Sequence, residues 1–253
     1  MANFFIDPEK YIQSKIRKAL QLNGLRQASP HGSWFQEARK VNQRQGDSRF
    51  VAKPSIFKSK KTGKEMQAES QNERSILAAL DTMPGVKWFD TQCFKFEYEA
   101  ADSQYEYTPD IIVGMEHGQI VVIEAKPAAF VCAQSNYRKY LAGKQLCGRK
   151  DWHFLILSSK EGLIEDMAAY RVDKEVEADF VKRLGDKEKG LSKDDIEAFK
   201  THHELKDSRN RAIAAIALRN DLAFRVINTK SQRQLVVGCA KLEDGCSWSR
   251  VIM

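Results

Sequence analysis

The sequence has little of what marks secreted, disulfide-linked or membrane-embedded proteins. Its five cysteines, at positions 93, 132, 147, 239 and 246, include no CxxC pair, and no secretory signal stands at the amino terminus. This pattern argues against both zinc binding and disulfide bonds. No apolar stretch approaches the roughly eighteen residues of a membrane-spanning helix. We therefore expect a soluble protein in a reducing cytoplasm, with no membrane partner.

Histidine, repeats and low-complexity tracts add no signal. Five histidines occur without ligand spacing, and internal repeats and low-complexity tracts are absent. His202 and His203 are adjacent on an expected helix, so their side chains should diverge around it, which favours a surface role over metal binding. At 253 residues the chain is long enough for one large domain or two modest ones with a proper core.

Charge is distributed unevenly along the chain. The formal net charge is +7, and residues 1–65 hold fourteen Lys and Arg against five Asp and Glu, whereas the remainder holds 27 against 29. This amino-terminal segment is expected to neutralise DNA phosphates, with an affinity that falls as salt rises. A solvated basic face is the alternative. The lysines expected to contact DNA are Lys53, Lys58, Lys60, Lys61 and Lys64.

The middle of the chain holds two short hydrophobic runs, each joined to an acidic residue. The motif Tyr107-Thr108-Pro109-Asp110 opens the first run, and Glu124-Ala125-Lys126 closes the second. Residues 115–118 between the runs have the composition of a turn, which predicts an antiparallel hairpin. Its register sets Ile111 opposite Ile123 and therefore Asp110 opposite Glu124.

The opposed acids predict a metal site. Opposed residues of a hairpin have Cβ atoms roughly 5 Å apart, so two carboxylates there repel unless a cation lies between them. A hard divalent ion with oxygen ligands is the expected occupant. Lys126 should project on the same side as Glu124, where it could orient or deprotonate a water for metal-assisted hydrolysis. Taken singly, Pro-Asp is also typical of a turn and Glu-x-Lys of a solvated strand end.

A third acidic residue shares the apolar stripe of a helix expected from Met66 to Leu80. Glu73 precedes Ile76 by three residues and Leu80 by seven, so it lies on the face that should pack against the sheet. An unpaired carboxylate is costly there unless it meets a cation or a donor. We therefore expect Glu73 to be functional, whereas an interaction with the helix dipole explains Glu69 near the helix start.

The series Glu73, Pro109-Asp110 and Glu124-Ala125-Lys126 resembles the PD-(D/E)XK nuclease signature. Over roughly residues 30 to 160, the order of further motifs resembles the TnsA family, the endonuclease subunits of heteromeric cut-and-paste DNA transposases. Some TnsA members carry glutamine where this chain has Glu124, which implies a more acidic metal site here. The further motifs are Ser33-Trp34-Phe35, Lys61-Thr62-Gly63-Lys64, Glu69-Ser70, Val86-Lys87-Trp88-Phe89, Phe94-Lys95-Phe96-Glu97-Tyr98, Tyr107-Thr108 and Pro127-Ala128-Ala129.

The resemblance implies an α/β, restriction-endonuclease-like fold, in which a mixed sheet is flanked by helices. It also implies a DNA endonuclease that depends on Mg²⁺ or Mn²⁺. By motif matching, Asp110 and Glu124 correspond to metal ligands, and Ala125 contributes its backbone carbonyl. Lys126 acts on the nucleophilic water, and Glu73 completes the acidic cluster as a possible further ligand.

The resemblance also implies partners. TnsA-like subunits cut the strand at the 5′ ends of a transposon, while a TnsB-like transposase of the integrase superfamily cuts and joins the 3′ ends. A TnsC-like AAA ATPase regulates both. The implied substrate is double-stranded DNA at transposon ends. The implied location is a prokaryotic cytoplasm, with nucleoid association during transposition.

The remaining sequence predicts further elements and a division into three segments. Gln134 to Cys147 is expected as a helix and Trp152 to Leu157 as a buried strand, which together would complete the mixed sheet. Residues 1–65 are expected to form a basic segment that packs on or extends the nuclease domain. Residues 66–172 should form the nuclease core. Residues 173–253 should form a smaller carboxy-terminal domain.

Helices followed by a hairpin are expected in that last segment. Ser192 is placed to cap one helix, and a second helix is expected from Ser208 to Arg219. Strands at Ala223 to Thr229 and Gln234 to Ala240 should pair around a basic tip. This order suggests a helix-turn-helix or winged-helix-like domain, which TnsA relatives carry, although the same order also occurs in domains with no nucleic-acid role.

Two alternatives stay open beside the transposase subunit. One is a freestanding nuclease of the restriction or repair type. The other is a noncatalytic DNA-binding adaptor that keeps the nuclease fold and uses its basic arm for assembly. The combination of Glu73, Asp110, Glu124 and Lys126 favours an enzyme, since an adaptor has no reason to keep four costly polar residues together.

Overall fold

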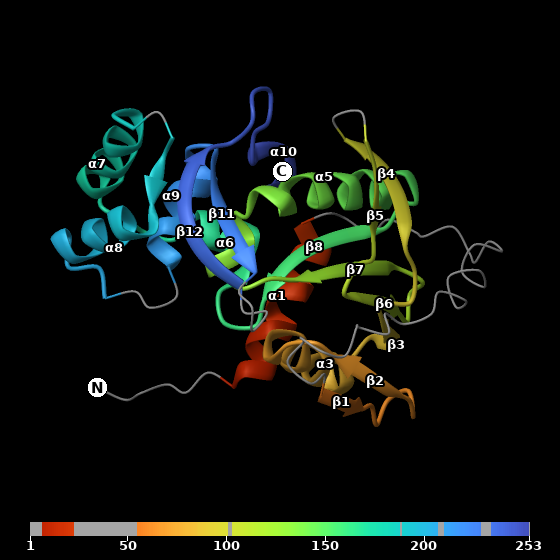
Figure 1. Ribbon diagram of the computed structural model, residues 1–253. Coiled ribbons are helices and arrows are strands. Elements are labelled where there is room, and N and C mark those ends of the chain that lie inside the picture. The colour runs from red at the N-terminus through yellow and green to blue at the C-terminus, as the bar shows by residue number, and fades with distance from the viewer. Residues whose placement is uncertain are drawn as a thin grey trace, which may run out of the picture. The chain divides into compact units, whose positions relative to one another are not determined.

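A computed structural model of the chain describes residues 7–22, 55–100, 103–187, 189–206, 210–228 and 234–252 (Figure 1). The chain divides into two compact units, each discontinuous in sequence. The first unit is Met1–Ala125 with Ala142–Gly162, and the second is Lys126–Leu141 with Leu163–Met253. The division into segments 1–65, 66–172 and 173–253 stays a prediction. No helix within the described ranges is long and apolar enough to cross a membrane.

The first unit is built on a mixed sheet of five strands in the order β3-β6-β7-β8-β9. Strand β6 pairs antiparallel with both β3 and β7, whereas β7 pairs parallel with β8. Two antiparallel ribbons, β1-β2 and β4-β5, accompany this sheet. The elements are α1 (Pro8–Leu22), β1 (Ser55–Lys58), β2 (Glu65–Ala68), α3 (Gln71–Thr82), β3 (Val86–Thr91), β4 (Phe96–Ala100), β5 (Ser103–Tyr107), β6 (Ile111–Met115), β7 (Ile120–Ala125), α5 (Gln134–Arg149, which begins in the second unit), β8 (His153–Ser158) and β9 (Gly162–Leu163).

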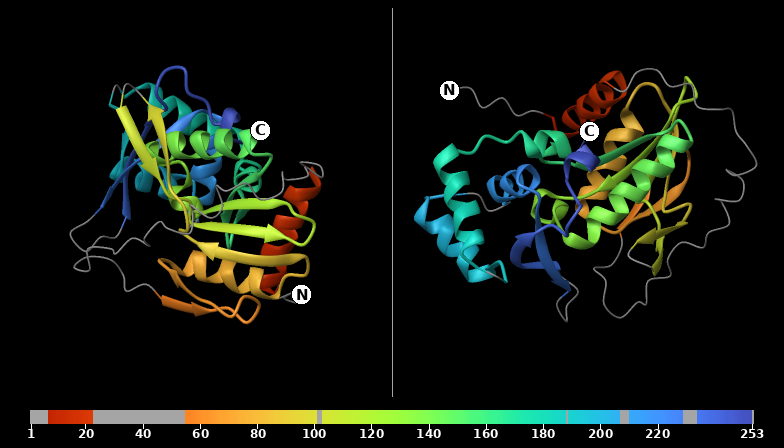
Figure 2. Two further views of the ribbon diagram at one scale, coloured as in Figure 1. Left: turned by 90° about the vertical axis from the view of Figure 1, so that its right-hand side faces the viewer. Right: turned by 90° about the horizontal axis from the view of Figure 1, so that it is seen from above.

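Helices cover both faces of this sheet, which confirms the expected α/β class. All residues of β6 and β7 are buried, as near-continuous apolar strands covered on two faces should be. Helix α3 lies against one face and the carboxyl half of α5 against the other (Figure 2). Under α5, Ile112 and Val122 pack with Leu146 and Trp152 in one buried cluster.

Close packing between β3 and β6 depends on a glycine. A Cβ atom added at Gly114 would lie 2.2 Å from the indole ring of Trp88, far inside van der Waals contact. The missing side chain therefore lets the Trp88 ring lie across the neighbouring strand. On the α3 side, the amide of Gln13 in α1 donates to the carbonyl oxygen of Ala79 at 3.0 Å and to Oγ1 of Thr82 at 2.9 Å. These bonds attach α1 to α3.

The helix predicted from Met66 to Leu80 begins later than expected, so that prediction was wrong at its amino end. Met66 lies in β2, and α3 begins at Gln71 with Ser70 as its N-cap. The Oγ atom of Ser70 accepts a hydrogen bond from the backbone N–H of Glu73 at 3.1 Å. A capping serine satisfies an orphan donor of the first turn, and this fixes where the helix starts.

The second unit combines helices with a three-stranded sheet in the order β10-β12-β11. Strand β12 pairs antiparallel with both neighbours. The predicted Ser192 cap is confirmed, since Ser192 Oγ accepts from Asp195 N at 3.2 Å. The elements are α4 (Ala128–Val131), α6 (Ile164–Ala168), α7 (Lys174–Gly185), β10 (Leu191–Ser192), α8 (Lys193–His202), α9 (Arg211–Arg219), β11 (Leu222–Asn228), β12 (Gln234–Lys241) and α10 (Ser249–Ile252).

Helix α9 lies in the interior of this unit. Every residue from Ala212 to Leu218 is buried, and the helix contacts α4, α6 and β11. The side chain of Arg219, at its carboxyl end, donates to the carbonyl oxygens of Ala168 at 2.7 Å and Tyr170 at 3.0 Å. The predicted hairpin is confirmed as β11 and β12, while its basic tip, residues 230–233, lies outside the described residues.

Candidate active site

The central hairpin brings the two predicted metal-binding carboxylates to one end of the sheet. Strands β6 and β7 pair with Ile111 opposite Ile123, which confirms the predicted register. Asp110 directly precedes β6, and its Oδ2 atom accepts a hydrogen bond from the backbone N–H of Ala125 at 2.8 Å. Asp110 is therefore tied to the residue after Glu124, at the carboxyl end of β7.

The turn of this hairpin is as predicted. The backbone N–H of Gly118 donates to the carbonyl oxygen of Met115 at 3.0 Å, and Met115 N donates to Gln119 O at 2.8 Å. Gly118 has a φ of 84°, a left-handed conformation that glycine adopts without steric cost. Because the turn fixes the register, it also fixes which acidic residues meet at the open end.

Glu124 is buried and has a specific donor. Its side chain is 2% exposed, and its Oε2 atom accepts a hydrogen bond from the phenolic O–H of Tyr107 at 2.5 Å. The Tyr107 ring packs edge-on against Phe96, with ring centroids 5.2 Å apart. Tyr107 is not among the site residues predicted from the sequence. The only signal for it was its place three residues before Asp110, at the end of a strand.

Ala125 ends strand β7, and Lys126 follows it. Ala125 is the last residue of β7 and is level with Leu157 of the parallel strand β8. Lys126 is the next residue, lies outside the strand and is half-buried. Pro127 is then the N-cap of α4.

Glu73 has a structural role that the sequence analysis missed. Its Oε2 atom accepts from the backbone N–H of Glu69 at 2.9 Å, and its Oε1 atom accepts from Ser70 Oγ at 2.8 Å. Together with the bond from Glu73 N to Ser70 Oγ, these contacts tie the Glu73 side chain to the N-cap of α3. These donors help explain how the Glu73 carboxylate is accommodated at 7% exposure. The signal was the Ser-x-x-Glu spacing.

The amino terminus of α3 nevertheless lies at the same edge of the sheet as the hairpin acids. The backbone N–H of Ser159 donates to Asn72 Oδ1 at 2.7 Å, just beyond the end of β8. The Asn72 amide approaches the carbonyl oxygen of Leu157, which is level with Ala125, at 3.5 Å. A helix amino terminus carries partial positive charge, so it stabilises anionic groups at this edge.

The donor set at the hairpin end fits a hard divalent cation such as Mg²⁺ or Mn²⁺. Carboxylate oxygens of Asp110 and Glu124 and the carbonyl oxygen of Ala125 are ligands of the type that these ions prefer. Hydrogen bonds from Ala125 N and from Tyr107 hold one oxygen of each carboxylate in place. The two acids are thereby oriented by protein donors before any ion binds.

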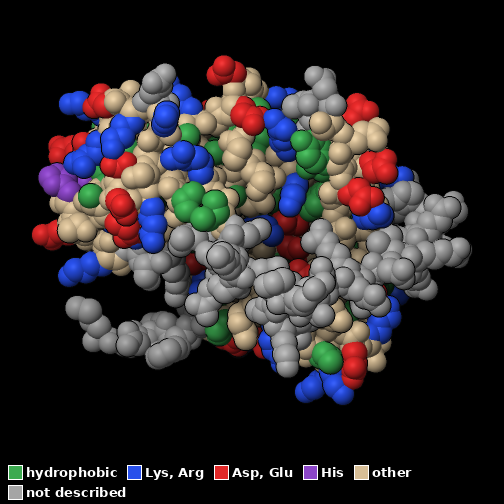
Figure 3. Space-filling model, viewed as in Figure 1, with side chains coloured by type: hydrophobic (Ala, Val, Ile, Leu, Met, Phe, Trp, Pro, Cys, Tyr) green, Lys and Arg blue, Asp and Glu red, His purple; other side chains and the backbone are tan. Residues whose placement is uncertain are grey.

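The lysines predicted to contact DNA have diverse surroundings. Lys58 pairs with Glu65 at 2.7 Å, and Lys64 pairs with Asp90 at 3.1 Å. The Lys61 ammonium donates to two backbone carbonyls at 2.9 Å, and so contributes to the fold. Lys60 is exposed, and Lys53 lies outside the described residues. Basic and acidic side chains are mixed where β1 and β2 reach the surface (Figure 3).

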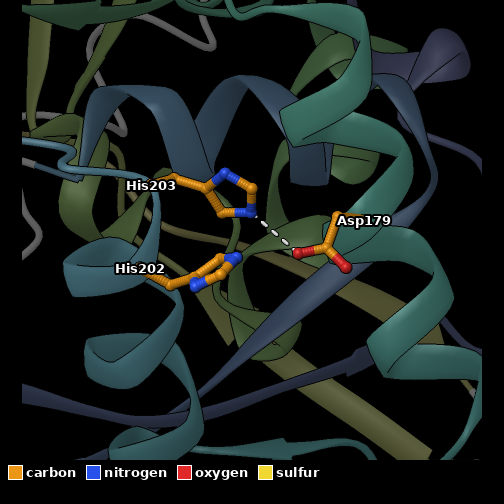
Figure 4. Close-up of side chains that lie close together, drawn as sticks. All are labelled: Asp179, His202 and His203. Atoms are coloured by element: carbon orange, nitrogen blue, oxygen red, sulfur yellow. Dashed lines mark hydrogen bonds and ion pairs between the residues drawn. The ribbon is translucent and has the colours of Figure 1, made fainter.

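A separate group of potential ligands occurs in the second unit. Asp179, His202 and His203 have ligand atoms that all lie within 4.8 Å of one another (Figure 4). The expectation that the two histidines diverge was wrong, because α8 ends at His202 and His203 is its C-cap. Their ring centroids are 4.7 Å apart.

Comparison with known proteins does not place the chain in a family. Neither a scan against protein-family models nor a search of the curated proteins finds a match to this sequence. The assignment of a function therefore rests on the residues and geometry of the hairpin site.

Proposed function

We propose that the chain is a metal-dependent DNA endonuclease that hydrolyses phosphodiester bonds at the hairpin site. The observation that carries this proposal is the junction of Asp110 with the end of β7, where its carboxylate bonds to the backbone of Ala125, the neighbour of Glu124. Asp110 and Glu124 lie at the same end of the hairpin and are followed directly by a lysine, so they would supply the ligands and the proton-transfer group that such hydrolysis needs.

Each residue has a definite part in this mechanism. Asp110 and Glu124, with the Ala125 carbonyl, would hold Mg²⁺ or Mn²⁺. A cation bound there supplies a Lewis acid that polarises the phosphate and acidifies a water. Lys126 would orient the attacking water and, as the neutral amine, accept its proton. As the bond from the water oxygen to phosphorus forms, the bond from phosphorus to the leaving oxygen breaks, and the lysine would then return the proton to that oxygen. Glu73, at the amino terminus of α3, adds negative charge at the same edge.

The biological setting that we propose is a heteromeric cut-and-paste transposase. In it, the chain cuts the 5′ ends of the transposon beside a TnsB-like integrase-superfamily transposase and under a TnsC-like AAA ATPase, in a prokaryotic cytoplasm. The support is the order of motifs around the site. We infer that the isolated chain binds DNA weakly through its basic amino-terminal segment and cuts specifically only with its partner.

We also propose that residues 173–253 form a winged-helix-like module whose third helix does not read DNA bases. The order α7-β10-α8-α9-β11-β12 and the sheet order β10-β12-β11 support this. The helix that would enter a major groove is α9, whose residues from Ala212 to Leu218 are buried. Because no row of exposed side chains is left on α9 to meet base edges, the module serves protein assembly instead.

A noncatalytic adaptor is the second candidate, and the hydrogen bonds of Glu73 at the start of α3 favour it. That carboxylate has a structural reason to be present, so it no longer counts as evidence for catalysis. The remaining evidence for an enzyme is the set Asp110, Glu124 and Lys126. An experiment on the first two of these residues separates the two candidates.

The test is cleavage of double-stranded DNA by the full chain with Mg²⁺, alone and with an integrase-type transposase and transposon-end DNA. Asp110→Ala and Glu124→Ala should abolish cleavage and leave the circular dichroism spectrum unchanged. Glu116→Ala is the matched control, because Glu116 is an exposed acid in the turn of the same hairpin. Cleavage by both variants at the wild-type rate would reject the hairpin site, and failure of the wild type to cleave with its partner would favour the adaptor. Efficient end-specific cutting without a partner would favour a freestanding nuclease.

A further inference from the structure

The ends of two helices bring a carboxylate and two imidazoles together in the second unit. Asp179 lies in α7, His202 is the last residue of α8, and His203 caps that helix. One nitrogen of each imidazole ring faces the Asp179 carboxylate (Figure 4). The Nε2 atom of His203 lies 2.7 Å from Asp179 Oδ2.

The end of α8 explains why the two adjacent histidines converge. The backbone N–H of His203 still donates to the carbonyl oxygen of Phe199 at 3.1 Å, but φ of −95° and ψ of 12° take the residue out of the helix. The His203 ring therefore folds back over Phe199, with centroids 4.5 Å apart, and meets the His202 ring at an interplanar angle of 85°. Phe199 is itself held edge-on to Phe180 at 4.9 Å.

One positive group faces the cluster. Arg183, one turn after Asp179 in α7, donates from Nε to Asp179 Oδ2 at 2.8 Å and lies over the Phe199 ring at 5.4 Å. Its positive charge repels a cation that binds to the same Asp179 oxygen. It also fixes the carboxylate in place, as outer hydrogen-bond partners of metal ligands do. His202 is exposed and the other two ligands are half-buried, so an ion can enter from solvent.

We propose that Asp179, His202 and His203 bind a divalent transition metal ion of the zinc class, which joins the carboxyl end of α8 to α7. Two imidazoles and one carboxylate are a ligand set that Zn²⁺ accepts, whereas Mg²⁺ prefers oxygen atoms alone. Three protein ligands leave the fourth tetrahedral position to water. This site is independent of the hairpin acids and of the proposed nuclease activity.

Metal binding requires the other tautomer of the neutral His203 ring. In the neutral tautomer that donates to Asp179, His203 carries its proton on Nε2. To bind a metal through that nitrogen, the ring must carry its proton on Nδ1. The metal then takes the place of the hydrogen bond between His203 and Asp179.

The test uses the full chain after treatment with a chelator, titrated with Zn²⁺ by calorimetry near neutral pH. Co²⁺ serves as a spectroscopic probe. Wild-type protein should bind one ion at this site with nitrogen and oxygen ligands, and the Co²⁺ spectrum should lack thiolate charge-transfer bands. His202→Ala and Asp179→Asn should each weaken binding at least about tenfold. Zn²⁺ should raise the melting temperature of the wild type more than that of either variant.

Two controls make the result decisive. His117→Ala removes an exposed histidine from the turn between β6 and β7, and should leave Zn²⁺ binding unchanged. His202→Ala removes an exposed side chain, so this variant should fold, and its circular dichroism spectrum checks that. Equal affinity in wild type, His202→Ala and Asp179→Asn would overturn the proposal, as would failure of the wild type to bind Zn²⁺ or a Co²⁺ spectrum dominated by thiolate.

Discussion

Tyr107 donates its phenolic hydrogen atom to Oε2 of Glu124 across 2.5 Å, and both side chains are buried. This hydrogen bond holds the Glu124 carboxylate, a ligand of the proposed metal site, in one orientation. The tyrosine therefore acts as a positioning residue for the proposed site. It comes from the end of β5, outside the five-stranded sheet.

Replacing Tyr107 with phenylalanine should weaken both the fold and the site. The change leaves a buried carboxylate oxygen without this donor, which costs about 1–3 kcal/mol. We expect a lower urea midpoint and weaker Mg²⁺ binding by calorimetry. Tyr105→Phe is the matched control, since Tyr105 lies in the same strand but is 41% exposed. Equal effects of the two changes would show that the hydroxyl of Tyr107 has no special role.

Replacing Lys126 with alanine should separate metal binding from cleavage. Because the lysine is assigned to the water and not to the cation, Mg²⁺ affinity should stay close to that of the wild type. The cleavage rate should fall about 10²- to 10⁴-fold, the usual contribution of a positioned acid or base. Titration calorimetry and single-turnover cleavage measure the two quantities. A loss of metal affinity as severe as in Asp110→Ala would disprove this division of roles.

Changes at Ser70 and Glu73 should tell whether Glu73 does more than hold the start of α3. Ser70→Ala removes the N-cap and should cost about 1 kcal/mol of unfolding free energy. Glu73→Gln keeps one of the two accepting oxygens, and its amide NH₂ can donate to Ser70 Oγ in place of the other bond, so it should cost less. If Glu73 is also a metal-site acid, Glu73→Gln should reduce cleavage while Ser70→Ala retains it. Chemical denaturation and cleavage assays on the same samples decide between the two roles.

The pH dependence of stability should include a contribution from Glu177. The hydrogen bond from Arg219 is the largest cause that lowers the pKa of Glu177 below its ordinary value of 4.5, and the amide of Asn220 adds to it. Because the folded-state pKa is lower than the unfolded one, this contribution is present above pH 4.5 and is lost as the pH falls through the folded value.

Glu177→Gln should therefore lower the melting temperature near neutral pH. Below the folded-state pKa of Glu177, wild type and variant should converge. Glu175→Gln is the control, because Glu175 is an exposed acid in the same helix turn. Thermal melts from about pH 7 down to about pH 3 measure the difference. A wild-type advantage that does not change with pH would contradict the assignment to the Glu177 carboxylate.

Two glycine-to-alanine changes should alter the free energy of unfolding in opposite directions. Gly114→Ala forces a methyl group against the Trp88 ring and should destabilise by about 1–3 kcal/mol. Gly148→Ala lies in α5, where an added Cβ meets no atom within 4 Å, and should stabilise by about 0.5–1 kcal/mol. Chemical denaturation of both variants measures the two effects. Stabilisation by Gly114→Ala would mean that Trp88 moves aside without strain.

Local patterns predicted much of the site. The turn at residues 115–118 and the apolar runs on either side of it predicted the pairing partner of Ile111. That pairing places Asp110 beside the end of β7. That register depends on residues close together in sequence. The predicted helix after residue 134 and strand after residue 152 are also confirmed, as α5 and β8.

Hydrophobic periodicity does not predict the other contacts, because they depend on where helices begin and end and on residues far apart in the sequence. The apolar stripe of α3 could be extended back to Met66, and only the capping serine, Ser70, shows where the helix begins. The convergence of His202 and His203 depends on the end of α8, since adjacent residues of a continuing helix do diverge. The bond from Tyr107 to Glu124 joins two separate strands, and no local pattern in the sequence encodes it.

The parallel pairing of β7 with β8 has a consequence for synthesis of the chain. Val121 pairs with His153, so about 30 further residues must leave the ribosome before β7 has its second neighbour. At roughly 5–20 residues per second, one edge of this apolar strand stays open for seconds. Exposed apolar edges invite aggregation, and a charged residue within them discourages it. Glu124 is the only charged residue in β7, so it would protect the nascent chain before the site exists.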